Sequence, residues 1–77
     1  MKLIIRNLAR TTTEAEVRLI FEEYGTVQSC TLVMDKTTGV SKGFGFVELP
    51  RPGEAKAAMK NLNGKEIHGN KIRVKNT

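Results

Sequence analysis

Two phenylalanines separated by one glycine constrain the fold of this chain more than any other feature. They lie in the segment Lys42–Leu49, which reads KGFGFVEL. A β-strand places residues two apart on the same side, so the rings of Phe44 and Phe46 must be buried together or exposed together. Burying them would also carry Glu48 into the core, where an unpaired carboxylate is strongly unfavourable. The segment therefore predicts a strand over 43–49 that displays both rings on an open sheet face.

Strand and helix patterns alternate along the rest of the chain. Short apolar or β-branched runs predict strands over 2–6, 27–34 and 71–75, with a small extra strand at 66–67. A capping box formed by Thr13 and Glu16 begins a predicted helix that ends at Gly25, and a second apolar stripe at 55, 58, 59 and 62 predicts another. The order βαββαβ indicates an α+β, ferredoxin-like sandwich, in which a four-stranded antiparallel sheet has two helices on one face.

The two-residue period of strands assigns each strand residue to one face of this sheet. The apolar set predicted to face the helices is Leu3, Ile5, Cys30, Leu32, Val47, Leu49, Ile72 and Val74. The set predicted to face solvent is Lys2, Ile4, Arg6, Thr31, Val33, Phe44, Phe46, Glu48, Lys71, Arg73 and Lys75. The open face is thus expected to combine two aromatic rings with basic side chains, and to hold Glu48 as its one acid.

Charge and size favour a binding domain with a polyanionic partner. The chain has 13 Lys and Arg against 8 Asp and Glu, a formal net charge of +5, which favours a partner such as nucleic acid. Exposed rings stack on bases while cations meet phosphates, so this surface is typical of single-stranded nucleic-acid binding. With 77 residues the chain supports one domain with a thin two-layer core, which disfavours an enzyme with a deep pocket.

The segment KGFGFVEL resembles the octapeptide signature of the RNA recognition motif family, with Leu49 in place of the final aromatic residue. Residues 3–8, LIIRNL, resemble the companion hexapeptide on the first strand, and the likeness extends over the whole chain. The resemblance implies a single RNA recognition motif domain over 1–77 that binds single-stranded RNA. It also implies that Phe46 stacks on a base, Phe44 lies against ribose and Lys42 meets a phosphate.

Two residues of the first strand depart from the family pattern. Ile4 stands where the family usually has a stacking aromatic residue, and it offers apolar contact without a π face. Arg6 replaces a small residue, and its guanidinium can stack on a base or pair with a phosphate. Glu48 can accept from a base amino group or pair with a neighbouring cation. The predicted RNA-binding set is completed by the outward cations Lys2, Lys71, Arg73 and Lys75.

Three alternatives to RNA binding remain open. Single-stranded DNA is close to RNA as a ligand, because only contacts to the 2′-hydroxyl distinguish the two sugars. A protein partner on the sheet face or the helices is a second alternative, with Ile4 and the two rings as an apolar dock. A small ferredoxin-like enzyme such as an acylphosphatase would need an anion-binding loop after the first strand, where Arg10 is the one candidate. No catalytic role is expected.

The remaining chemically notable residues receive structural interpretations. Cys30 is expected to be a small buried hydrophobe, and a lone cysteine is typical of an intracellular protein. His68 is expected in a turn and has no histidine or cysteine partner for a metal, while Met34 and Met59 are expected in the core. No apolar run approaches the roughly 20 residues of a membrane span. We therefore expect a cytoplasmic monomer without a cofactor that acts in post-transcriptional regulation.

Overall fold

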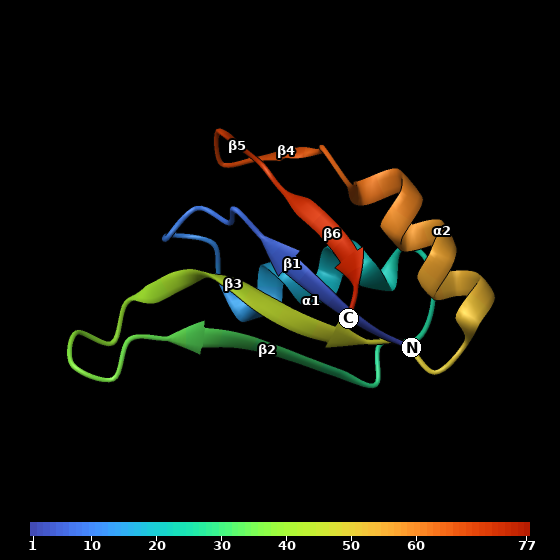
Figure 1. The fold of residues 1–77 in the computed structure, drawn as a ribbon, viewed down its shortest axis with the longest axis horizontal. Coiled ribbons are helices and arrows are strands. Elements are labelled where there is room, and N and C mark those ends of the chain that lie inside the picture. Colours follow the sequence, from blue (N-terminus) through green and yellow to red (C-terminus); the bar gives the residue numbers. More distant parts are fainter.

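The computed structural model describes all 77 residues and has two layers, a sheet and a pair of helices. The main sheet contains β1 (Lys2–Arg6), β2 (Ser29–Met34), β3 (Ser41–Glu48) and β6 (Arg73–Asn76), in the antiparallel order β2-β3-β1-β6. Helices α1 (Glu14–Glu22) and α2 (Pro52–Leu62) pack on one face of it (Figure 1). A separate ribbon pairs β4 (Glu66–Ile67) with β5 (Asn70–Lys71). The predicted ferredoxin-like fold is confirmed.

The core between sheet and helices contains every strand residue that the two-residue period assigned to it. All eight are buried, and Leu3, Ile5, Val47 and Leu49 have no exposed surface. Phe21 of α1 and Leu62 of α2 complete this layer from the helix side. Leu49 therefore serves packing, which explains how an aliphatic residue can replace the family's aromatic residue at that position.

Helix α1 begins at the predicted capping box. The hydroxyl of Thr13 accepts from the backbone N–H of Glu16 at 3.2 Å, and the Glu16 carboxylate accepts from the N–H of Thr13 at 3.1 Å. These contacts satisfy amides that the first helical turn leaves without partners. Val17 and Phe21, one turn apart, then bury one stripe of the helix in the core.

The end of α1 differs from the prediction. The helix stops at Glu22 with Glu23 as its C-cap, so the assignment of Gly25 as the cap is wrong. Gly25 instead lies against Glu54 of α2, where an added Cβ atom would overlap the Glu54 side chain. The Glu54 Oε1 atom accepts from the N–H of Thr26 at 3.2 Å, which holds that side chain in place. The contact between these two segments therefore favours a glycine at this position.

Strand β2 is shorter and less regular than predicted. It begins at Ser29, two residues after the expected start, although Val27 is buried before it. The register with β3 shifts between Leu32 and Met34. Such an irregularity reverses the alternation of side chains, and Met34 is accordingly 49% exposed. The prediction that Met34 belongs to the core is wrong, whereas Met59 does pack against it.

The last predicted strand is divided in the structure. Ile72 lies between β5 and β6 and exchanges backbone hydrogen bonds with the turn after α2, donating to Lys65 O at 2.9 Å and accepting from Gly64 N at 2.7 Å. Lys71 therefore lies in the two-stranded ribbon, and the prediction that it faces out from the main sheet is wrong. The small strand predicted at 66–67 is confirmed as β4.

Candidate nucleic-acid interface

The face of the main sheet opposite the helices displays the two predicted rings. Phe44 and Phe46 are both partly exposed, and their centroids lie 6.4 Å apart at an interplanar angle of 83°. Gly45 between them points toward the core. A Cβ atom there would overlap the carbonyl oxygen of Thr31 and lie 2.7 Å from the Leu32 side chain. The glycine thus allows β2 to pack closely against the strand that presents the rings.

The register of the strands places Ile4 beside Phe46. Phe46 is opposite Thr31 on one side and Ile4 on the other, and Ile4 is in turn opposite Lys75. Directly opposed residues in antiparallel strands have adjacent side chains. This row across the sheet therefore presents a single aromatic face, flanked by one aliphatic side chain and one cation.

Lys2 and Glu48 form the neighbouring row at the edge of the rings. They are opposite each other in β1 and β3, and the Lys2 Nζ atom lies 5.0 Å from the centroid of the Phe46 ring. That distance is typical of a cation–π contact. The Glu48 carboxylate accepts a long hydrogen bond of 3.4 Å from the Ser29 hydroxyl. Phe46 is thus covered by an ammonium group, and Glu48 retains capacity to accept further hydrogen bonds.

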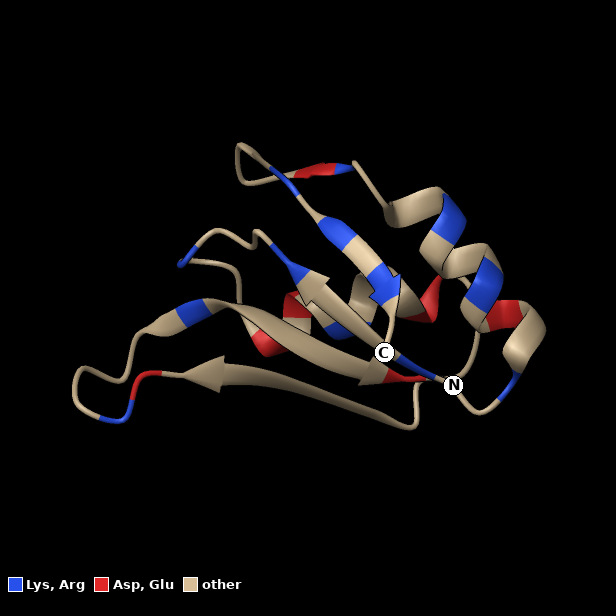
Figure 2. Cartoon of the chain, in the orientation of Figure 1, with Lys and Arg blue, Asp and Glu red and all other residues tan.

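Basic side chains surround the rings without acidic partners. Arg6 of β1 is opposite Arg73 of β6, and like charges placed in this way repel each other. The two ion pairs of the structure join Arg51 to Glu54 and His68 to Glu16. The cations on and beside the sheet, Arg6, Lys42, Arg73 and Lys75, are therefore free to meet an anion. Figure 2 shows basic positions on the strands of the main sheet and acidic positions on both helices.

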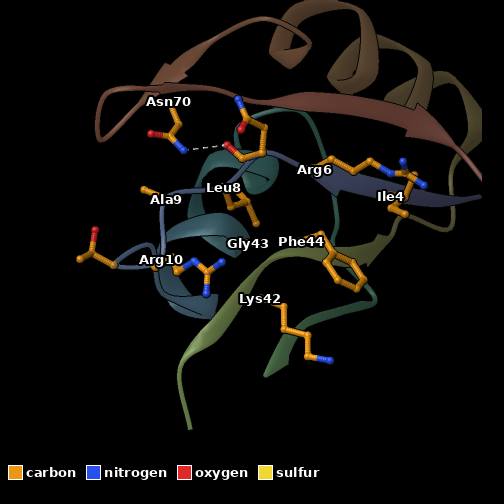
Figure 3. Close-up of a pocket in the computed structure, with 11 residues that line it drawn as sticks. Ile4, Arg6, Leu8, Ala9, Arg10, Lys42, Gly43, Phe44 and Asn70 are labelled. Carbon is orange, nitrogen blue, oxygen red and sulfur yellow. Dashed lines mark hydrogen bonds between the residues drawn. The ribbon is translucent and has the colours of Figure 1, made fainter. Parts of the chain in front are cut away.

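A groove of about 760 Å³ continues the open face beyond Phe44, at the end of β1. It lies between the loop after β1 and the start of β3, and its lining includes the basic side chains of Arg6, Arg10 and Lys42 (Figure 3). Asn70, the first residue of β5, also lines it. The sequence singled out Arg10 only as a candidate for an enzyme loop, because its position beside Lys42 depends on a tertiary contact.

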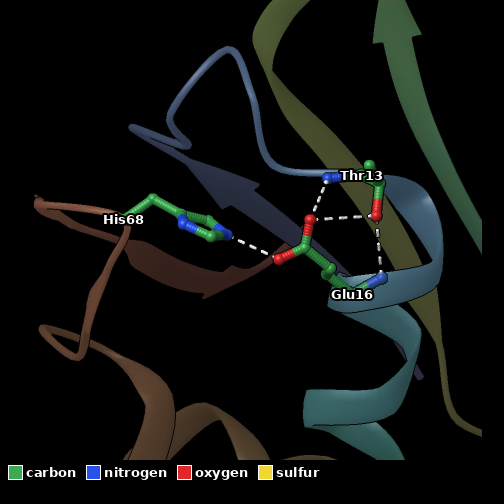
Figure 4. A network of polar contacts seen from close by, with 3 residues as sticks. All are labelled: Thr13, Glu16 and His68. Carbon is green, nitrogen blue, oxygen red and sulfur yellow. Dashed lines mark hydrogen bonds and ion pairs between the residues drawn. The ribbon is translucent and has the colours of Figure 1, made fainter.

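The ribbon of β4 and β5 is tied to α1 by a polar network beside this groove. His68 in the turn of the ribbon pairs through Nε2 with the Glu16 carboxylate, whose other oxygen accepts from Thr13 (Figure 4). The contact with His68, followed by the hydrogen bonds from Thr13, holds the pKa of Glu16 below its ordinary value. His68 lies in a turn as predicted, and its partner is a carboxylate.

Cys30, the second residue of β2, has its side chain buried in the core. Burial raises the pKa of its thiol to about 11, so the thiol remains protonated and unreactive near neutral pH. The predicted packing role of this residue is thereby supported.

Neither helix of the structure is long and apolar enough to cross a membrane.

The fold and the open face define a class of protein: a ferredoxin-like domain whose exposed sheet carries aromatic and basic side chains. A sequence profile of the RNA recognition motif matches residues 3–73. The chain is 42% identical over 74 residues to the human cleavage stimulation factor subunit 2 tau variant, covering 96% of this chain and 12% of that protein. It is 41% identical over 73 residues to the mitochondrial glycine-rich RNA-binding protein 2 of Arabidopsis thaliana, covering 95% of this chain and 46% of that protein.

The chain belongs to the RNA recognition motif family. It spans less than half the length of these two curated relatives. Among solved structures, RNA Binding Protein PG1 superimposes with a TM-score of 0.94 at 35% identity, covering 97% of this chain and 90% of that one. A complex of the Sxl-lethal protein with RNA has a TM-score of 0.94 at 28% identity, covering 99% of this chain and 46% of that one.

Proposed function

We propose that this domain binds single-stranded RNA across the open face of its main sheet. The observation that carries the proposal is the partly exposed ring of Phe46, framed by Ile4 and by cations that have no acidic partner. An exposed aromatic patch is unfavourable in water unless it meets a ligand. The Sxl-lethal protein, whose fold superimposes on this chain, is in complex with RNA, and this likeness supports the same assignment.

The orientation of the two rings supports different roles for them. Successive bases of a single strand that stack in parallel can lie flat on only one of two perpendicular rings, and the planes of Phe44 and Phe46 differ by 83°. Phe46 stacks on a base, which also contacts Ile4 in the same row of the sheet. Phe44 then presents its ring to the ribose of a neighbouring nucleotide.

Stacking on Phe46 requires the ammonium group of Lys2 to move from the ring. An exposed cation–π contact contributes about 0.5–1 kcal/mol, whereas stacking of a base on an aromatic ring contributes about 1–3 kcal/mol. The base therefore displaces Lys2, and the released ammonium group meets a phosphate. Lys2 and the base compete for one face of the ring, so Lys2 also shields that ring in the unbound protein.

Phosphates and base edges complete the proposed contacts. Lys42, Arg6, Arg73 and Lys75 neutralise phosphates, and Lys71 adds a cation from the ribbon beside the sheet. Glu48, whose one hydrogen bond is long, accepts from a base amino group. If roughly three phosphates are neutralised, the logarithm of the binding constant falls with the logarithm of salt concentration with a slope near −2.

The test is the affinity of Phe46→Ala for short labelled RNA and DNA pools, measured by fluorescence anisotropy at several salt concentrations. Loss of stacking is expected to remove about 1–3 kcal/mol of binding free energy, which is roughly a 5- to 150-fold weaker affinity. The melting temperature is expected to stay near that of the wild type, because the ring lies on the open face. Tighter binding of RNA than of DNA would indicate contacts to the 2′-hydroxyl.

Leu19→Ala is the matched control, because Leu19 is an apolar side chain of α1 that is 65% exposed on the helix layer. Its removal is expected to leave RNA affinity unchanged. Equal affinity of Phe46→Ala and the wild type, or a flat salt response of the wild type, would contradict RNA binding on the sheet. Early melting of Phe46→Ala would show that the ring is needed for folding.

A further inference from the structure

The groove beyond Phe44 is formed by three segments that are distant in sequence. Strand β1 and the loop after it supply Ile4 and Arg6–Thr11, the start of β3 supplies Lys42–Phe44, and the ribbon supplies Asn70. In Figure 3 the side chain of Arg10 extends from the loop toward β3, on which Lys42 and Phe44 lie. The groove therefore opens where the sheet ends, directly beside one of its exposed rings.

Hydrogen bonds fix the walls of the groove. The N–H of Leu8 donates to Gly43 O at 2.8 Å, and Asn7 Nδ2 donates to Lys71 O at 2.8 Å. Asn70 Nδ2 donates to Asn7 O at 3.3 Å, which closes the contact between ribbon and loop. Gly43 has a φ of 83°, a left-handed conformation that favours glycine. Because the walls are held in this way, little ordering entropy is lost when a ligand enters.

The lining of the groove carries positive charge. Arg6, Arg10 and Lys42 line it, and its lining contains no Asp or Glu. The ion pairs of the structure involve other residues. Three cations around one groove repel each other, and an anion placed among them relieves that repulsion. Arg and Lys are also the side chains that bind phosphate groups most effectively.

The neutral part of the lining suits a nucleoside. Leu8 and Phe44 supply apolar contact, while the side-chain Oδ1 atoms of Asn7 and Asn70 accept no hydrogen bond within the chain. Amide oxygens accept hydrogen bonds from donors on base edges. The volume of about 760 Å³ falls within the range of pockets for small organic ligands, roughly 300–1,000 Å³. A nucleoside phosphate therefore fits the groove better than a bare inorganic anion.

We propose that this groove binds a further nucleotide of the strand that crosses the sheet, with its phosphate held by Arg10 and Lys42. Phe44 lines the groove, and its partly exposed ring also contacts that of Phe46 on the open face, so the two surfaces are continuous. The inference rests on the proposed function and extends the RNA path to the loop after β1. A free nucleotide in solution has the same chemistry, and the test separates these two sources.

The test compares Arg10→Gln with Lys56→Gln, which removes the same charge from the exposed surface of α2. Labelled RNA oligonucleotides of increasing length, from about two to about six nucleotides, are titrated into each variant at several salt concentrations. Once the strand is long enough to reach the groove, Arg10→Gln is expected to flatten the salt slope by about 0.7, which corresponds to roughly a fourfold loss of affinity at about 0.15 M salt.

Equal affinities of Arg10→Gln and Lys56→Gln at every length would overturn the groove proposal while leaving binding on the sheet intact. Absence of any binding by the wild type would instead overturn the proposed function itself, and the groove with it.

In a second arm, uridine and adenosine monophosphates are titrated while the backbone signals of residues 7–11 are followed. Binding of a free monophosphate as tight as that of the longest strand would also overturn the assignment to a strand.

Discussion

At the scale of single residues, we expect Ile4 to limit base recognition by the proposed site. It lies between Phe46 and Lys75 in one row of the sheet, where an aromatic residue would give a second π face. An isoleucine contributes apolar contact alone. The proposed site therefore stacks one base and depends more on the cations around it than a site with two stacking residues would.

Replacing Ile4 by tyrosine is expected to strengthen RNA binding. The new ring would stack on a second base, which contributes about 1–3 kcal/mol, and Ile4 is partly exposed, so the larger side chain can extend from the open face. Fluorescence anisotropy with a short labelled RNA measures the gain. Ile4→Leu is the matched control, since it changes shape without adding a π face. A gain equal in both variants would show that stacking is not the cause.

Most strand residues could be assigned to a face from the sequence because strand periodicity is fixed by backbone geometry. Met34 could not, since the register shift after Leu32 reverses the period and leaves no clear sequence signal. The position of Arg10 beside the start of β3 could not be predicted from the sequence either. Its position depends on the contact between Leu8 and Gly43, which are 35 positions apart in the chain.

At the scale of elements, Glu16 joins α1 to the ribbon of β4 and β5. Its carboxylate accepts from the cap residue Thr13 and pairs with His68. The sequence predicted the capping box because both partners are local, and it could not predict the pairing with a residue 52 positions away. The sequence could not predict the division of the last strand for a similar reason, because the backbone of Ile72 forms hydrogen bonds with the turn after α2.

Acidification is expected to weaken the attachment of the ribbon. The pKa of Glu16 is held below its ordinary value of 4.5 by His68 and then by Thr13. A carboxyl group with a lowered pKa in the folded state stabilises the fold above its unfolded pKa, and this contribution is lost as pH falls through the folded value. Urea unfolding between about pH 3 and pH 7 should therefore show stability falling in the acidic range.

Glu16→Gln is the informative variant for this effect, because glutamine retains the capping hydrogen bond without titrating. Its stability is expected to depend less on pH in the acidic range than that of the wild type. The pH dependence of stability that remains in this variant includes a contribution from Asp35, whose pKa is lowered by hydrogen bonds from the backbone amides of Thr38 and Thr37. An identical pH profile in the variant and the wild type would show that Glu16 contributes nothing.

At the scale of the whole molecule, the two layers differ in charge as well as in composition. Four of the acidic residues lie in α1 and α2, whereas Glu48 is the one acid on the open sheet face (Figure 2). A separation of charge between two faces orients an approaching polyanion toward the basic face. For the proposed RNA site, this separation of charge would favour approach of the strand from the side of the open sheet face.

The fold as a whole could be predicted because independent sequence patterns agree on it. The helical stripes, the alternating strands and the exposed pair Phe44 and Phe46 all require a sheet covered on one face. The groove at the end of β1 could not be predicted, since segments 7–11, 42–44 and residue 70 meet only in the folded chain. Local patterns therefore predict the proposed sheet site, whereas its proposed extension depends on tertiary contacts.

The most direct test of RNA binding on the sheet is a titration of isotope-labelled protein with a short RNA pool, followed by the backbone amide signals. Signals of residues 4, 6, 44, 46 and 73–75 are expected to shift, and the shifts should shrink as salt rises because phosphate contacts weaken. Signals of the exposed residues of α1 and α2 are expected to stay in place. Shifts confined to the helices, or no shift with RNA at low salt, would contradict RNA binding on the open sheet face.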